Sequence, residues 1–218
     1  MYFKKIFIFL FIILCFNFYG NGQNVDINIL QPINQSETTF KNNFFKVTSE
    51  TVTVFNILAP VSLLTAGIIK HDKQLQKNAA YMVGGFVVSS IVTQSMKRII
   101  KRDRPYVTYP YIINRYVGSS SYSFPSGHTS SAFSTATSLS LLFPKWYVIV
   151  PSYLYAATVG YARMYQGVHY PSDVIAGALV GAGSAWLCYK AEKWMDKKHK
   201  QNKKSASNLS LKEKRFVY

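Results

Sequence analysis

The chain has 218 residues, which is room for one domain. Its 25 Lys and Arg residues outnumber its 9 Asp and Glu residues and give a formal net charge of +16, which would suit nucleic acid or anionic lipid. Because 49% of the residues are hydrophobic and 16% are aromatic, we expect a membrane partner and exclude nucleic acid.

The N-terminus carries a targeting or anchoring signal. Lys4 and Lys5 precede an apolar run, Ile6–Phe16, and the small residues Gly20 and Gly22 follow it. This order is typical of a secretory signal peptide, and an uncleaved first transmembrane helix is the alternative. Both interpretations cover residues 1–22 and place the chain that follows outside the cytoplasm.

The rest of the chain predicts an all-α fold, a bundle of five to six mostly transmembrane helices. Residues 23–50 are polar and are interpreted as an extracytoplasmic arm with no chemistry of its own. Residues 51–190 form the bundle domain, and residues 191–218 form a Lys-rich cytoplasmic tail. The bundle is inferred from five stretches without charged residues, as expected of helices that are buried or face lipid: Thr51–Ile69, Asn78–Met96, Tyr116–Pro144, Trp146–Ala162 and Val174–Tyr189.

Loop charges test the topology of this bundle. Lys70–Lys77, Lys145 and the tail after Lys190 fall on the cytoplasmic side, as the positive-inside tendency expects. The run Lys97–Pro105 carries five cations and falls on the outer side. A basic run that breaks this tendency is a candidate for function, while snorkelling to headgroups or an inverted topology are the alternatives.

The tetrapeptide Pro125-Ser126-Gly127-His128 is expected to begin a helix, because proline is favoured at the first helical position. The N–H groups of Ser126, Gly127 and His128 would then be unpaired at the positive end of the helix dipole, which makes an anion site. Gly127 would let an oxyanion approach the main chain, and Ser126 would add a hydroxyl. An ordinary helix start is the alternative.

A second proline, Pro171, is expected to begin the last helix of the bundle. His169 would then lie on the connector and Asp173 in the first turn. The carboxylate can reach back four residues to the imidazole, fix its tautomer and leave the other ring nitrogen free as a nucleophile or base. Alternatively, Asp173 simply caps the helix and His169 is a polar loop residue, although the nearby Arg163 favours the first interpretation.

These pieces resemble, residue by residue, the signature of the type 2 phosphatidic acid phosphatase superfamily, which also contains bacterial acid phosphatases and vanadium haloperoxidases. The signature is a Lys six residues before Arg-Pro, then Pro-Ser-Gly-His, then Ser-Arg followed after five residues by His and after three more by Asp. The chain has these groups in the same order: Lys97, Arg104-Pro105, Pro125–His128, Arg163, His169 and Asp173. One position departs, since Ala162 replaces the Ser and removes a minor hydroxyl.

The resemblance implies a metal-independent phosphatase without a cofactor. His169 would attack phosphorus to form a phosphohistidine, Asp173 would hold His169, and His128 would protonate the departing oxygen and later serve as the base for water. The phosphate oxygens would be bound by cationic and hydrogen-bonding groups: Lys97, Arg104, Ser126, Gly127 and Arg163.

Two further features of the basic end fall outside the signature. Arg98, Lys101 and Arg102 match none of its positions and are interpreted as charge that faces lipid headgroups. The Tyr-rich loop Pro105–Tyr116 is expected at the membrane–water boundary, at the mouth of a lipid site, or as packing of a soluble domain.

The expected activity is hydrolysis of a lipid phosphate monoester or a polyprenyl diphosphate, in the bacterial cytoplasmic membrane and with the site facing the periplasm. A soluble periplasmic acid phosphatase is one alternative, since the N-terminal signal permits it, and a non-catalytic protein that grips anionic headgroups is another. Vanadium haloperoxidase chains are usually much longer. Acyl chains leave no motif, so the lipid is left open, as is the oligomeric state.

Overall fold

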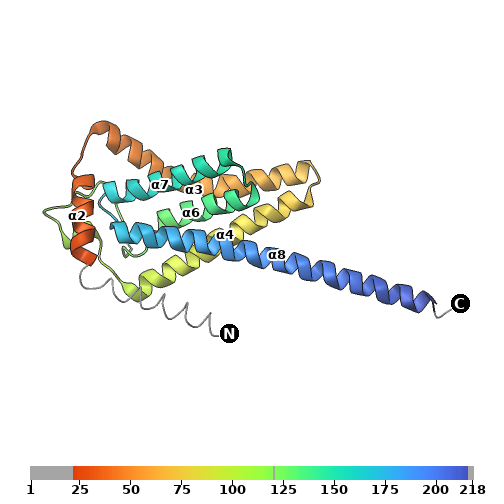
Figure 1. The fold of residues 1–218 in the computed structure, drawn as a ribbon. Coiled ribbons are helices and arrows are strands. Elements are labelled where there is room, and N and C mark those ends of the chain that lie inside the picture. The colour runs from red at the N-terminus through yellow and green to blue at the C-terminus, as the bar shows by residue number, and fades with distance from the viewer. Residues whose placement is uncertain (1–21, 120, 216–218) are drawn as a thin grey trace.

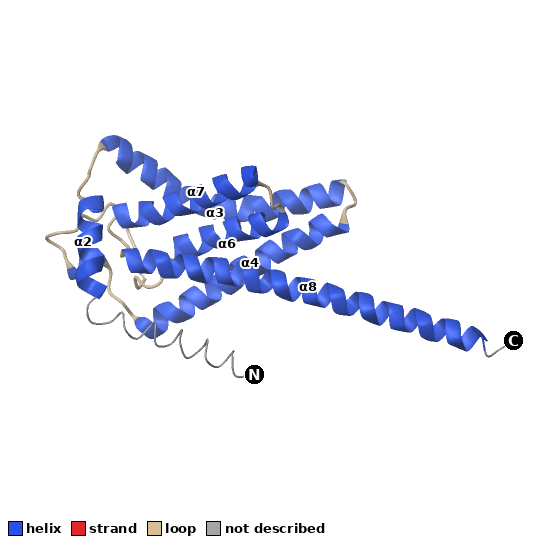
Figure 2. Cartoon of the chain, in the orientation of Figure 1, coloured by secondary structure: helices blue, strands red, loops and turns tan. Residues whose placement is uncertain are grey.

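The computed structural model describes residues 22–119 and 121–215, and apart from Gly22 the predicted signal or anchor lies outside the described residues. The described residues form helices and no strand, so the predicted all-α fold is confirmed (Figures 1 and 2). The helices are α2 (Gly22–Asn34), α3 (Thr39–Ile69), α4 (Lys73–Ile100), α5 (Pro105–Thr108), α6 (Gly127–Leu142), α7 (Trp146–Tyr165) and α8 (Pro171–Arg215).

The helix starts follow from local capping chemistry. Thr38 caps α3, because its hydroxyl oxygen accepts the N–H of Lys41. Asp72 caps α4 in the same way with its carboxylate, and Pro171 occupies the first position of α8 as the sequence predicts.

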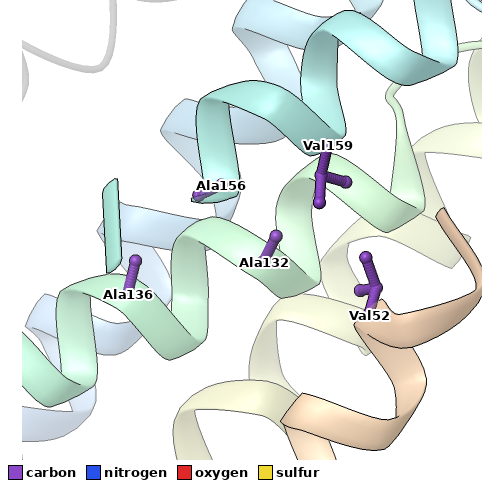
Figure 3. Close-up of a cluster of buried hydrophobic side chains, with 5 residues drawn as sticks. All are labelled: Val52, Ala132, Ala136, Ala156 and Val159. Carbon is purple, nitrogen blue, oxygen red and sulfur yellow. The ribbon is translucent and has the colours of Figure 1, made fainter. Parts of the chain in front are cut away.

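Helix α6 is the centre of the bundle and packs against α3, α4, α7 and α8. Its small side chains permit this enclosure on all sides. Ala132 and Ala136 of α6 meet Val52 of α3 and Ala156 and Val159 of α7 in a buried apolar cluster (Figure 3). The hydroxyl of Ser130 on α6 faces α4, where it hydrogen-bonds with the hydroxyl of Ser89 at 2.5 Å.

One close approach fixes the spacing of α6 and α8. A Cβ atom on Gly181 would lie 2.0 Å from the main-chain oxygen of Ser130, so only glycine fits at this crossing. Helices that meet through small residues in this way are characteristic of membrane bundles.

Three described helical stretches are long and apolar enough to cross a membrane. They are Thr39–Ile69, which is α3, Lys73–Thr108, which covers α4 and α5, and Pro171–Lys203, which lies within α8. They expose large apolar side chains outward, including Ile57, Ile91 and Leu179. The other two predicted spans correspond to α6 and α7. Helix α6 has 16 residues and is enclosed by the other helices, which explains why it carries no charge yet is rich in Ser and Thr.

Most of the residues assigned to an arm, and residues 191–215 of the predicted tail, are helical. Helix α2 lies across one end of the bundle, where it contacts α7 and α8 (Figure 1). At the other end α8 continues without interruption into the Lys-rich segment and projects beyond the other helices.

Candidate active site

All the sequence-predicted site residues lie at the end of the bundle that α2 crosses (Figure 1). Each is placed by a helix terminus or a short connector. The positions are the last turn of α4 for Lys97, the start of α5 for Arg104, the start of α6 for Ser126, Gly127 and His128, the last turn of α7 for Arg163, the α7–α8 connector for His169 and the first turn of α8 for Asp173. The fold therefore brings together groups that are up to 76 residues apart in sequence (Lys97 to Asp173).

His169 is buried, with 2% of its surface exposed. Its Nε2 lies 3.3 Å from Nη1 of Arg104, and its Nδ1 lies 3.5 Å from Oδ2 of Asp173. Because a guanidinium only donates, Nε2 carries the lone pair and the ring hydrogen sits on Nδ1, toward the carboxylate. Burial lowers the pKa of His169 to about 3 against the opposing effect of Asp173, so the imidazole is neutral at pH 7.

The carboxylate of Asp173 is held by three donors. Its Oδ2 accepts the main-chain N–H of Tyr170 at 2.9 Å and the hydroxyl of Ser123, and its Oδ1 accepts Nη1 of Arg102 at 2.8 Å. Asp173 is fully buried. These bonds hold the carboxylate in one orientation beside His169. Asp173 therefore does more than cap α8.

The prediction that Arg102 faces lipid headgroups is wrong. Its guanidinium turns inward, bonds Asp173 and Asp26 of α2, and lies 3.8 Å over the ring of Tyr170. The reason is electrostatic. The buried carboxylate of Asp173 stabilises the guanidinium of Arg102 beside it more than exposure to water at the surface would.

The three predicted phosphate-binding cations, Lys97, Arg104 and Arg163, are buried. Arg104 donates to the main-chain oxygens of Ser121 and Val168, and Lys97 donates to those of Tyr122 and Ser123.

Arg163 donates to Oε1 of Gln166 at 2.8 Å, while its Nε has no partner among the described residues. Within residues 22–119 and 121–215, none of the three cations lies within 4.0 Å of a carboxylate oxygen. Their uncompensated charge suits an anion.

The start of α6 differs from the prediction. The helix begins at Gly127, two residues after Pro125, and Ser126 is its N-cap residue. The cause is a tertiary hydrogen bond, because the N–H of Ser126 donates to the main-chain oxygen of Asp173 at 3.0 Å and holds Ser126 extended. The N–H groups of Gly127 and His128 therefore lead the helix, and the N–H of Ser126 is not available to an anion.

Charge around His128 couples its protonation to the anion. Burial and the cations Arg163, Arg104 and Lys97 lower the pKa of His128 to about 4. These effects thus favour a neutral His128 at pH 7. A phosphate dianion placed among the same cations would offset their effect and favour the imidazolium that a general acid requires.

Comparison with known proteins places this geometry in a family. The model of a protein family, the PAP2 superfamily, matches residues 78–196, which is more than half of the chain. These residues include every residue of the predicted site. The chain belongs to the PAP2 superfamily. The predicted resemblance is thereby confirmed, and this PAP2 protein is a phosphatase with membrane-spanning helices.

Individual relatives extend the match. An undecaprenyl-diphosphatase of Sulfolobus acidocaldarius is 29% identical, with 88% of this chain and 92% of the relative covered. A lipid A 4'-phosphatase of Bacteroides thetaiotaomicron is 38% identical over 40% of this chain and 38% of its own length. The crystal structure of a transmembrane PAP2 type phosphatidylglycerolphosphate phosphatase from Bacillus subtilis shares the fold, with a TM-score of 0.72, 24% identity and coverage of 88% of this chain and 97% of that one.

Sequence reasoning missed two side chains at this site, Asp26 and Ser123. Ser123 lies two residues before Pro125, and its role depends on the loop path that carries it to Asp173. Asp26 is 147 residues before Asp173, within the segment interpreted as an arm. Its one signal in the sequence is that acidic residues are rare, 9 in 218.

Proposed function

We propose that this PAP2 phosphatase hydrolyses a lipid phosphate monoester or a polyprenyl diphosphate through a phosphohistidine on His169. The observation that carries the proposal is the placement of a neutral, buried His169 between Arg104 and Asp173, at the bundle end where three cations converge without a carboxylate partner among the described residues. The ring nitrogen with the lone pair is the one that faces the cations, and so the one that faces a bound phosphate.

The chemistry proceeds in two displacements. Nε2 of His169 forms a bond to phosphorus as the bond from phosphorus to the lipid oxygen breaks, and His128 gives that oxygen a proton. Water then attacks the phosphohistidine with neutral His128 as its base, which releases phosphate and restores His169. Lys97, Arg104 and Arg163, with the N–H of Gly127, would stabilise the charge on the equatorial oxygens.

Two observations favour a lipid substrate. The candidate site residues lie at one end of a bundle with three helices long and apolar enough to cross a membrane, so a lipid headgroup would be within reach of them. The relatives reported above are named for undecaprenyl diphosphate and for lipid A. We place the site on the periplasmic face of the cytoplasmic membrane, since the Lys-rich end of α8 is opposite to it.

The test uses the purified full chain in detergent with four substrates: phosphatidate, phosphatidylglycerol phosphate, undecaprenyl diphosphate and lipid A. Rapid quenching with a ³²P-labelled form of the preferred substrate should trap an acid-labile phosphoenzyme. His169→Ala should lose the intermediate and nearly all turnover. His71→Ala is the control and should keep both, because His71 is exposed and lies just after the C-terminal end of α3. Turnover by His169→Ala near the wild-type rate would reject the mechanism.

A further inference from the structure

Helix α2 contributes a buried carboxylate to the network behind the nucleophile. Asp26 is 6% exposed, its Oδ2 accepts Nη2 of Arg102 at 2.7 Å, and its Oδ1 accepts the main-chain N–H of Ser172 at 2.9 Å. The same Arg102 donates through Nη1 to Asp173 at 2.8 Å. A continuous chain of contacts therefore runs from Asp26 through Arg102 and Asp173 to His169.

The charges along this chain do not cancel. Arg102 contributes one positive charge and the two carboxylates contribute two negative charges, so the group Asp26, Arg102 and Asp173 carries a net charge of −1. If Asp26 were neutral, Arg102 would compensate Asp173 alone. The carboxylate facing His169 would then be less able to stabilise positive charge that develops on the imidazole when Nε2 bonds to phosphorus.

We propose that Asp26 is a positioning residue of the phosphatase reaction. It holds Arg102 against Asp173 and shares the guanidinium charge, so that Asp173 stays oriented and negative while His169 is phosphorylated. This inference rests on the proposed phosphohistidine mechanism. It makes the N-terminal helix α2 a part of the active site.

Helix α2 has a separate anchor, which distinguishes this role from simple attachment. At its other end the side chain of Asn34 donates to the main-chain oxygens of Asn114 and Tyr165, both at 2.9 Å, and accepts the N–H of Asn114 at 2.7 Å. Leu30 between the two ends is fully buried. The helix is thus attached by contacts that do not involve the charge of Asp26.

The two anchors give a matched pair of variants. Asp26→Asn keeps the size of the side chain and an acceptor for Ser172 but removes the charge. Asn34→Ala removes the second anchor and leaves the charged network intact. In each variant, quench-flow gives the rate constant of phosphoenzyme formation, and its burst amplitude counts the folded enzyme, so a partly unfolded sample does not change the rate constant.

We expect Asp26→Asn to lower kcat and the phosphorylation rate constant about 10- to 100-fold, the range found when outer partners of metal-binding histidines are removed, with KM changed less than about 2-fold. Asn34→Ala should lower the unfolding temperature but phosphorylate at the wild-type rate constant. A wild-type rate constant in Asp26→Asn, or an equal loss in Asn34→Ala, would overturn the inference. Absence of a phosphoenzyme in the wild type would instead reject the proposed mechanism.

A double-mutant cycle tests the route through Arg102. Because Asp26 acts by way of this guanidinium, the variant that combines Asp26→Asn with Arg102→Gln should phosphorylate no more slowly than Arg102→Gln alone. Losses that multiply would show that Asp26 works independently of Arg102 and would overturn the proposed route.

Discussion

The main-chain N–H of Ser126 donates to the main-chain carbonyl of Asp173 at 3.0 Å. This bond fastens the first turn of α6, which leads with Gly127 and His128, to the first turn of α8, which holds the carboxylate behind His169. The spacing between the proposed phosphate-binding groups of α6 and the proposed nucleophile His169 therefore depends on how closely α6 and α8 pack.

Gly181→Ala should destabilise the protein. Its Cβ would meet the main-chain oxygen of Ser130 at 2.0 Å and force α6 and α8 apart, and overpacking of this kind costs about 1–3 kcal/mol. Gly183→Ala, two residues later on α8, is the matched control, since a Cβ there meets nothing within 4 Å. Thermal unfolding in detergent should show a lower midpoint for Gly181→Ala than for Gly183→Ala, and equal midpoints would contradict the packing argument.

His128→Ala should slow both halves of the reaction, because in the proposed mechanism this imidazole gives the proton to the leaving oxygen and later takes one from water. Loss of a general acid–base group costs about 10²- to 10⁴-fold in rate. Single-turnover experiments should show slower formation and slower breakdown of the phosphoenzyme. If only one of the two steps slows, His128 does not serve in both.

Acid should destabilise the empty enzyme through its buried histidines. The pKa of His128 is lowered to about 4 and that of His169 to about 3, from 6.5. Between pH 6.5 and these values the unfolded chain binds more protons than the folded one, so the free energy of unfolding falls as the pH falls. Denaturant titrations from pH 7 to pH 4 should show this loss, and His169→Gln should reduce it. A loss as steep in His169→Gln as in the wild type would exclude His169 as a source.

Activity should survive excess EDTA, because Lys97, Arg104 and Arg163 supply the positive charge that a metal ion supplies in other phosphatases. Orthovanadate should inhibit, since a pentacoordinate vanadate matches the transition state for which the site is shaped. The measurement is turnover of the preferred lipid with each reagent. Strict dependence on added Mg²⁺ would be incompatible with the proposed chemistry.

The two ends of the bundle should label from opposite sides of the membrane. Single cysteines are placed at Thr108, in α5 near the site, and at Ser207, in the far part of α8, in a background that combines Cys15→Ser and Cys188→Ser. With a permeabilised outer membrane, Thr108→Cys should react with an impermeant maleimide. Ser207→Cys should react only after the inner membrane is broken, and reaction of both beforehand would refute the proposed sidedness.

The sequence predicted the groups that a short spacing defines. Arg163, His169 and Asp173 lie within 11 residues, and the connector between two helices determines where they meet. The all-α class followed from stretches without charge. These features are local, so stretches without charge, proline placement and short spacings were sufficient to predict them.

Tertiary contacts decided the rest. Pro125 does not begin α6, because Ser126 bonds to Asp173 from another helix. Arg102 appeared to be surface charge because its partner Asp26 lies 76 residues away, with no spacing rule to connect them. Likewise, the sequence of α6 does not separate enclosure by other helices from enclosure by lipid, since both exclude charge.

Helix α8 runs unbroken for 45 residues, which at 1.5 Å per residue is about 67 Å, roughly twice the hydrocarbon thickness of a bilayer. Asp173 stands at one end of this helix, and the Lys-rich half of the helix projects beyond the rest of the bundle. A spin label or fluorophore on that half would therefore report the tilt of the same helix that carries Asp173, and so give an optical or magnetic measure of active-site geometry without a label near the substrate.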